Sequence, residues 1–102
     1  MRQLTSDQEI KDVIHEDQSI LFFYTPFCQN CKIAERMLRI VAEARGTIHN
    51  IYTCDLNHFP WMAEMHKIQS VPALTVFKNG KIGRTLFAFE SVIRVDQFLE
   101  EY

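Results

Sequence analysis

The sequence lacks several features that would assign it to a large protein class at once. It has no long apolar run, and its longest such stretch is far shorter than the roughly 20 residues that cross a bilayer. Residues 1–11 are polar and charged and contain no apolar core of a secretory signal peptide. No repeat, linker or low-complexity tract interrupts the chain. We therefore expect one domain over residues 1–102, located in the cytoplasm and without a membrane partner.

The chain also lacks a strong excess of one charge. It carries 11 lysine and arginine residues against 13 aspartate and glutamate residues, and its net charge is −2 at pH 7. No basic cluster is present, so we expect no nucleic-acid partner. Hydrophobic residues make up 47% of the chain, which is ordinary for a globular core, so folding does not require a scaffold of disulfides.

Cysteine is scarce, but two of the three cysteines form a Cys-x-x-Cys pair, Cys28 and Cys31. In a reducing cytosol such a pair is more often catalytic or metal-binding than structural. Five consecutive apolar or aromatic residues, Ile20–Tyr24, precede the pair and predict a strand buried on both faces. A long helical pattern follows the pair. The two thiols are therefore expected at a helix N-terminus, where unpaired N–H groups and partial positive charge stabilise a thiolate.

Strand and helix patterns alternate along the rest of the chain. Ser6 and Glu9 fit a helix capping box, and Asn79-Gly80 is a strong hairpin signal. This order predicts an α/β fold with a central mixed sheet, mostly parallel with an antiparallel hairpin and flanked by helices on both faces. Strands are expected in Met1–Thr5, Ile20–Tyr24, Thr47–Cys54, Leu74–Phe77 and Ile82–Ala88, and helices begin near Ser6, Cys28, Pro60 and Ser91, the second ending at Gly46. The expected core-facing residues of the last three helices are Ile33, Met37, Leu38, Ile40, Val41 and Ala44, then Trp61, Met62, Met65 and Ile68, then Val92, Val95, Phe98, Leu99 and Tyr102.

Over its whole length the chain resembles the thioredoxin family. The residues that carry the resemblance are Tyr24, Phe27, Cys28, Cys31 and Lys32, then Val71-Pro72, then Phe77-Lys78-Asn79-Gly80-Lys81. The resemblance implies a thioredoxin fold and thiol–disulfide exchange, with Cys28 as the nucleophile and Cys31 as the resolving thiol. It implies that Pro72 follows a cis peptide bond and that Val71 offers backbone groups to the substrate. The residues Phe27, Gln29 and Asn30, which flank the thiols, are the further expected substrate contacts.

The same resemblance implies which partners the protein uses. We expect a monomer without a bound cofactor or metal that reduces disulfides in other proteins and contributes to cell redox homeostasis. Its electrons would come from a reductase similar to thioredoxin reductase or from a low-molecular-weight thiol.

Several positions depart from the family pattern. Gln29-Asn30 replaces the usual Gly-Pro, and Phe27 replaces the usual Trp. Phe22 stands where the family usually buries an Asp, and Ile51 where it places the partner Lys. A phenyl ring cannot accept the proton of the resolving thiol, so resolution is expected to depend on water or hydroxide.

Each chemical interpretation has an alternative. Cys28 and Cys31 could be ordinary buried cysteines, or they could bind zinc together with Cys54 and His58, which gives the four ligands of a structural zinc site. Cys54 is expected in the core, because free cysteine is commonly buried; otherwise it lies near Cys28 at the carboxyl edge of the sheet. Pro72 could be an ordinary turn proline, and Phe59 and Trp61 are expected to pack in the core rather than form a docking surface. For the whole chain, the alternative is a non-catalytic interaction module with the same fold.

Overall fold

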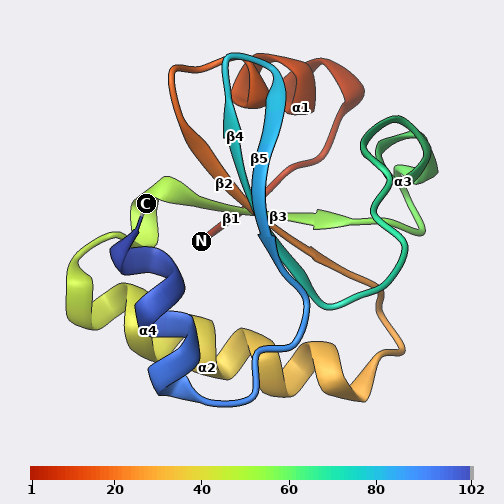
Figure 1. Ribbon diagram of the computed structural model, residues 1–102. Coiled ribbons are helices and arrows are strands. Elements are labelled where there is room, and N and C mark those ends of the chain that lie inside the picture. Colours follow the sequence, from red (N-terminus) through yellow and green to blue (C-terminus); the bar gives the residue numbers. More distant parts are fainter. Residues whose placement is uncertain (102) are drawn as a thin grey trace.

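Strand β2, Ser19–Tyr24, is the centre of a five-stranded sheet with the strand order β1-β3-β2-β4-β5. A computed structural model describes residues 1–101, and Tyr102, an expected core residue, lies outside them. No helix in this described part is long and apolar enough to span a membrane. The elements follow the predicted order (Figure 1). They are β1 Arg2–Gln3, α1 Asp7–Ile14, β2, α2 Gln29–Arg45, a 3-10 turn Ile48–Asn50, β3 Ile51–Asp55, α3 Pro60–His66, β4 Ala73–Lys78, β5 Lys81–Leu86 and α4 Val92–Glu100.

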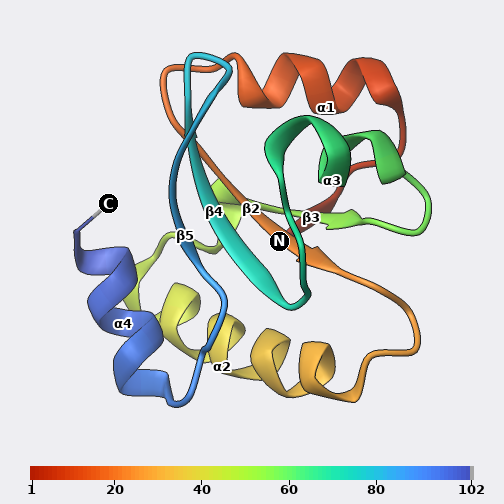
Figure 2. The same ribbon diagram turned by 45° about the vertical axis from the view of Figure 1, so that its right-hand side comes forward.

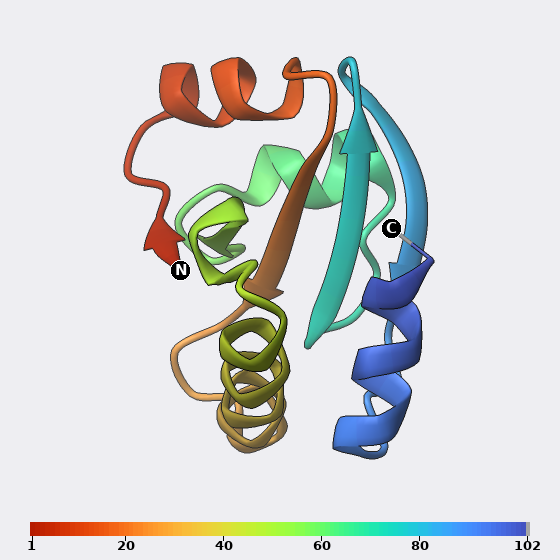
Figure 3. The ribbon, with the colours of Figure 1, turned by 90° about the vertical axis from the view of Figure 1, so that its left-hand side faces the viewer.

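The burial of β2 on both faces is confirmed. Ile20 and Phe22 belong to a core against α2 and α4, whereas Leu21 and Phe23 belong to a second core against α1 and α3. Alternate side chains of a strand point to opposite faces, so a run of apolar residues fills both cores at once. Figure 2 shows α1 and α3 on one side of the sheet and α2 and α4 on the other. The side view in Figure 3 shows α2 and α4 next to each other below the sheet.

The mixed sheet and the hairpin are confirmed, but the sheet is not mostly parallel. β1, β3 and β2 run parallel, whereas β4 is antiparallel to β2 and β5 is antiparallel to β4. The connection through α3 explains the difference. This helix has seven residues and spans about 10 Å, about half the length of a strand. It is therefore too short to carry the chain back along the sheet to the edge where β2 and β3 begin. β4 instead starts at the edge where β2 and β3 end, and so runs antiparallel to β2. That edge is the one at which α2 begins.

Helix α2 presents to the core a face that matches the predicted one only in part: Leu38 and Val41 are buried as expected. It ends at Gly46, which has the left-handed conformation typical of a helix C-cap (φ 71°), as expected. Ile33 and Ile40, predicted to be buried, are 48% and 58% exposed, and Ala44, predicted to face the core as well, is also exposed. The sequence pattern failed because small side chains, rather than the largest apolar ones, allow the helix to lie close to the sheet. The buried residues are Cys31, Ala34, Leu38, Val41 and Ala42.

Four smaller predictions also need correction. The segment 47–54 is not one strand, because a 3-10 turn precedes β3. β1 is shorter than predicted, and β5 ends at Leu86 instead of Ala88. Met65 and Val92 are exposed rather than buried. Helices α3 and α4 are short, and their core-facing sides are already occupied by other apolar residues, namely Met62 in α3 and Val95, Phe98 and Leu99 in α4. Phe59 is buried and Trp61 is half-buried, with its indole N–H donating to Asp7 at 2.8 Å, so both pack within the fold as expected.

Candidate dithiol site

The first turn of α2 is built around Cys28. Its backbone N–H donates to the carbonyl of Thr25 at 3.3 Å, which turns the chain after β2. Cys28 is also the N-cap residue of α2, and its Sγ accepts the backbone N–H of Cys31 at 3.0 Å. A helix start has N–H groups without intrahelical partners, so this sulfur satisfies one of them. The hydrogen bond is stronger when the sulfur is a thiolate, because an ionised acceptor attracts the N–H more strongly.

Cys28 and Cys31 are joined as a disulfide, with a Cα–Cα distance of 5.2 Å. The two sulfurs differ in their access to solvent, because Cys28 is half-buried and Cys31 is only 3% exposed. One position can therefore be reached by another molecule, whereas the other is shielded under the first turn of the helix. This arrangement suits a pair of thiols in which one exchanges with an external disulfide and the other closes an internal one.

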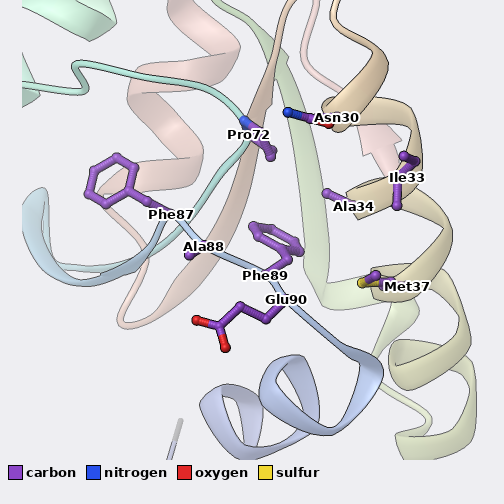
Figure 4. Close-up of a pocket in the computed structure, with 9 residues that line it drawn as sticks. All are labelled: Asn30, Ile33, Ala34, Met37, Pro72, Phe87, Ala88, Phe89 and Glu90. Carbon is purple, nitrogen blue, oxygen red and sulfur yellow. The ribbon is translucent and has the colours of Figure 1, made fainter.

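The Val71–Pro72 peptide bond is cis, in agreement with the expectation from the resemblance. Both residues are half-buried, and they precede β4 directly. Ala73, the first residue of β4, pairs with Phe23 near the end of β2. The proline therefore lies at the edge of the sheet where α2 starts, and Pro72 and Asn30 line the same groove (Figure 4).

This groove has a volume of about 280 Å³ and runs along α2 from Asn30, which lies between the two cysteines in the sequence, to Met37. Figure 4 shows α2 on one side and the segment that joins β5 to α4 on the other. Ile33 and Phe87, both apolar and exposed, form part of its walls, and Glu90 is the one charged residue among those that line it. These residues were not among the predicted site residues, because Ile33 was expected in the core and no motif lies near Phe87 in the sequence. The lining residues are Asn30, Ile33, Ala34, Met37, Pro72, Phe87, Ala88, Phe89 and Glu90.

The other expected substrate contacts lie outside this groove. Phe27, directly before the dithiol, is 94% exposed, which is unusual for so large an apolar side chain. Gln29 is exposed in the first turn of α2. Phe27 and Gln29, the neighbours of Cys28 in the sequence, thus present accessible apolar and amide groups next to it.

Among residues 1–101, the core below α2 contains no carboxylate. Phe22 and Ile51 are fully buried, and both belong to the core that α2 and α4 cover. The ring of Phe22 stacks on Tyr24 at a centroid distance of 6.3 Å and meets Phe89 edge-on at 5.9 Å. The two departures from the family pattern thus form one apolar region.

Cys54 is a core residue on the opposite face of the sheet. It is fully buried with Leu21 and Phe23 in the core that α1 and α3 cover, whereas Cys31 belongs to the helix on the other face. Burial, with a smaller effect from the charge of Asp55, raises the pKa of the Cys54 thiol to about 12. Because the thiolate is the reactive species, a thiol with so high a pKa reacts slowly, and Cys54 is not suited to thiol–disulfide exchange.

The zinc alternative gains no support from the geometry. Cys28 and Cys31 are bonded to each other, and Cys54 is separated from them by the sheet. Within residues 1–101, no group of three or more histidine, cysteine, aspartate or glutamate side chains is arranged to hold a metal ion.

Comparison with known proteins gives a consistent result. The family model described as "Thioredoxin" matches residues 2–100. The thioredoxin-like protein YusE of Bacillus subtilis is 34% identical over 90 residues, which cover 88% of this chain and 84% of that protein. Thioredoxin of Chlamydia trachomatis is 28% identical over 81 residues, covering 79% of this chain and 78% of its own. Among solved structures, thioredoxin from Plasmodium falciparum superposes with a TM-score of 0.85 at 23% identity and covers 100% of this chain and 99% of its own, which shows the shared fold.

Proposed function

Since the chain belongs to the thioredoxin family, we propose that Cys28 and Cys31 are the catalytic thiols through which it acts as a thiol–disulfide oxidoreductase. Family, fold and the Cys-x-x-Cys pair together support this activity. The observation that carries the assignment is the difference in access between the two sulfurs: Cys28 is half-buried at the cap of α2 and Cys31 is buried beneath it.

In the proposed reaction the thiolate of Cys28 attacks one sulfur of a substrate disulfide. The substrate S–S bond breaks, a mixed disulfide with Cys28 forms, and the first substrate thiolate leaves. Cys31 then loses its proton and attacks the sulfur of Cys28, so the second substrate thiolate leaves and the Cys28–Cys31 disulfide forms. The substrate gains two electrons and the protein loses two.

The helix start favours the thiolate of Cys28. Lowering a thiol pKa from about 8.5 to about 7 requires about 2 kcal/mol of selective stabilisation of the anion. A helix N-terminus contributes about 0.3–1 kcal/mol at an exposed position and up to about 2 kcal/mol when partly buried. Cys28 is half-buried at such a terminus and accepts the Cys31 N–H, so these two interactions together are of the required size.

We propose that the substrate chain lies across the dithiol and beside Pro72. Val71 would contribute backbone groups, Phe27 and Gln29 would contact the substrate on one side, and Asn30 would contact it at the mouth of the groove. The exposed apolar surface of Phe27 supports a macromolecular substrate, because an unpartnered side chain of this size gains free energy when another protein covers it.

Protein disulfides and a reductase partner are general expectations for this family. More specifically, we propose a monomer of one domain that works in the cytoplasm without a bound cofactor or metal. Its electrons would come from a reductase similar to thioredoxin reductase or from a low-molecular-weight thiol.

Insulin reduction with a supplied reductant tests this function. Wild-type protein should accelerate the reaction, Cys28→Ser should abolish it, and Cys31→Ser should accumulate a mixed disulfide that mass spectrometry detects on Cys28. Full activity of Cys28→Ser would refute the assignment.

A further inference from the structure

Resolution of the mixed disulfide needs a proton acceptor, and the core beneath α2 offers none. Cys31 must lose its proton before its sulfur can attack. Phe22 and Ile51, on the face of the sheet that α2 covers, are fully buried and apolar. The buried polar side chains within residues 1–101 are hydroxyls, which do not accept a proton to form a stable cation at neutral pH. They are Ser19, Thr53 and Thr75.

Cys31 borders a second hollow, on a different side of α2 from the groove. This hollow has a volume of about 150 Å³. A space of that size accommodates several water molecules, since each takes up about 30 Å³ in the liquid. It places space for water directly beside Cys31, although this residue is only 3% exposed. The lining residues are Tyr24, Thr25, Pro26, Cys31, Lys32 and Glu35.

Glu35 is the carboxylate that faces this hollow. It follows Cys31 by four residues in α2, and side chains at this spacing are neighbours, with Cβ atoms about 5–6 Å apart. Cys31 and Glu35 line the same hollow, so water in it can bridge the thiol and the carboxylate. Arg39, on the next turn, forms an ion pair with Glu35, and its Nε lies 3.1 Å from Oε2. Both side chains are exposed, so this pair contributes little to the position of the carboxylate.

The other ionisable groups around Glu35 are compatible with a carboxylate at this position. Lys32 and Arg39 are cations on α2, and Tyr24 is a phenol at the end of β2. Burial, then Asp55, and then Cys54 and Glu35 raise the pKa of Tyr24, so the phenol stays protonated. Tyr24 accepts a hydrogen bond from Gln3 at 2.7 Å, and its own O–H remains a donor that can orient water in the hollow.

We propose that Glu35 is the general base for Cys31 and takes its proton through water in this hollow. The inference rests on the proposed function and concerns its second step, in which Glu35 replaces the water or hydroxide that the sequence led us to expect as the base. The proton of Cys31 passes to Glu35, the Cys31 sulfur bonds to that of Cys28, and the substrate thiolate leaves with the electron pair of the broken S–S bond. The neutral carboxyl group then returns its proton to the departing thiolate or to solvent, which restores the starting state.

Stopped-flow reaction of the reduced protein with 5,5′-dithiobis(2-nitrobenzoate) separates the two steps. Attack by Cys28 releases one coloured thiolate, and attack by Cys31 on the mixed disulfide releases the second. Glu35→Gln should leave the first phase unchanged and slow the second by roughly 100-fold, the lower end of the effect of a positioned general base. In this variant the second rate should rise about tenfold per pH unit, because hydroxide becomes the base.

Two matched variants control for charge and for the ion pair. Arg39→Gln removes the ion pair and keeps the carboxylate, and Glu43→Gln removes an exposed carboxylate elsewhere on α2. Both should show wild-type rates in both phases. The proposal is overturned if the second phase of Glu35→Gln stays within about twofold of wild type, or if Arg39→Gln slows it equally. If wild-type protein lacks the two phases altogether, the proposed function itself fails, and with it this proposal.

Discussion

Introducing a carboxylate at Phe22 is the sharpest test of the apolar region beneath α2. Phe22→Asp removes a fully buried ring that contacts Tyr24 and Phe89. Truncating a buried phenylalanine costs about 3–5 kcal/mol, and an unsatisfied buried polar group adds about 1–3 kcal/mol. A loss of about 4–8 kcal/mol is comparable to the whole stability of a small domain, about 5–15 kcal/mol. Urea denaturation followed by circular dichroism should therefore show a protein that is barely folded at neutral pH.

The stability that Phe22→Asp loses should increase as the pH rises. The core supplies no cation, so burial raises the pKa of the new carboxyl group above its ordinary value of about 3.9. The folded state then binds a proton more tightly than the unfolded state. The variant should lose least stability below pH 4, relative to wild type, and progressively more as the pH rises toward the raised pKa. A penalty that stays constant from about pH 4 to 7 would contradict the placement of the carboxyl group in the core.

Ile51→Lys provides the matching second change. Ile51 lies in the same core as Phe22, on the adjacent strand, where Ile20 pairs with Ile51 and Phe22 with Thr53. Their side chains are therefore diagonal neighbours, within reach of an ion pair. The double variant should be more stable than the sum of the single losses predicts, with a coupling of about 0.5–3 kcal/mol. Simple additivity would show that the two positions do not face each other and would refute the reasoning.

Three further predictions concern separate parts of the molecule. Cys54→Ala should leave insulin reduction unchanged and lower stability by about 1–2 kcal/mol, because only packing is lost; a loss of activity at unchanged stability would contradict this. Burial lowers the pKa of His66 below 6.5, so stability should fall as the pH drops below about 6.5. His66→Gln should reduce that fall in urea titrations, and an identical pH profile would refute it. Phe87→Ser should raise the KM for insulin about tenfold, roughly 1.4 kcal/mol of lost apolar contact, without changing kcat; an unchanged KM would place the substrate elsewhere.

Much of the fold could be predicted because its signals are local. The run of apolar residues in β2, the serines that cap α1 and α4, and the Asn79-Gly80 turn each act within a few residues of their own position. The exposed face of α2 could not be predicted in this way. Ile40 is as apolar as any core residue, but the sheet lies against the side of the helix that carries the small residues.

Part of the candidate site could likewise be predicted from the sequence, and part could not. Cys28, Cys31 and Pro72 were identified from motifs and their resemblance to a family, and the structure brings them to one edge of the sheet. The groove was missed, because its two walls are about 55 residues apart in the sequence and meet only through packing of the segment before α4 against α2. Glu35 carries no motif either. A role for Glu35 is inferred only from the structure, because position 22 holds a phenylalanine instead of a carboxylate and because Glu35 lines the hollow beside Cys31.

A redox titration of the Cys28–Cys31 couple tests the central claim most directly. Protein equilibrated in buffers of oxidised and reduced thiols, then alkylated and weighed by mass spectrometry, should convert between a dithiol and an internal disulfide in one two-electron transition. The ratio of the two forms should change tenfold per roughly 30 mV, and Cys54 should remain a thiol throughout. A protein whose Cys28 and Cys31 stay reduced across the range, or gain only separate adducts, would contradict the account.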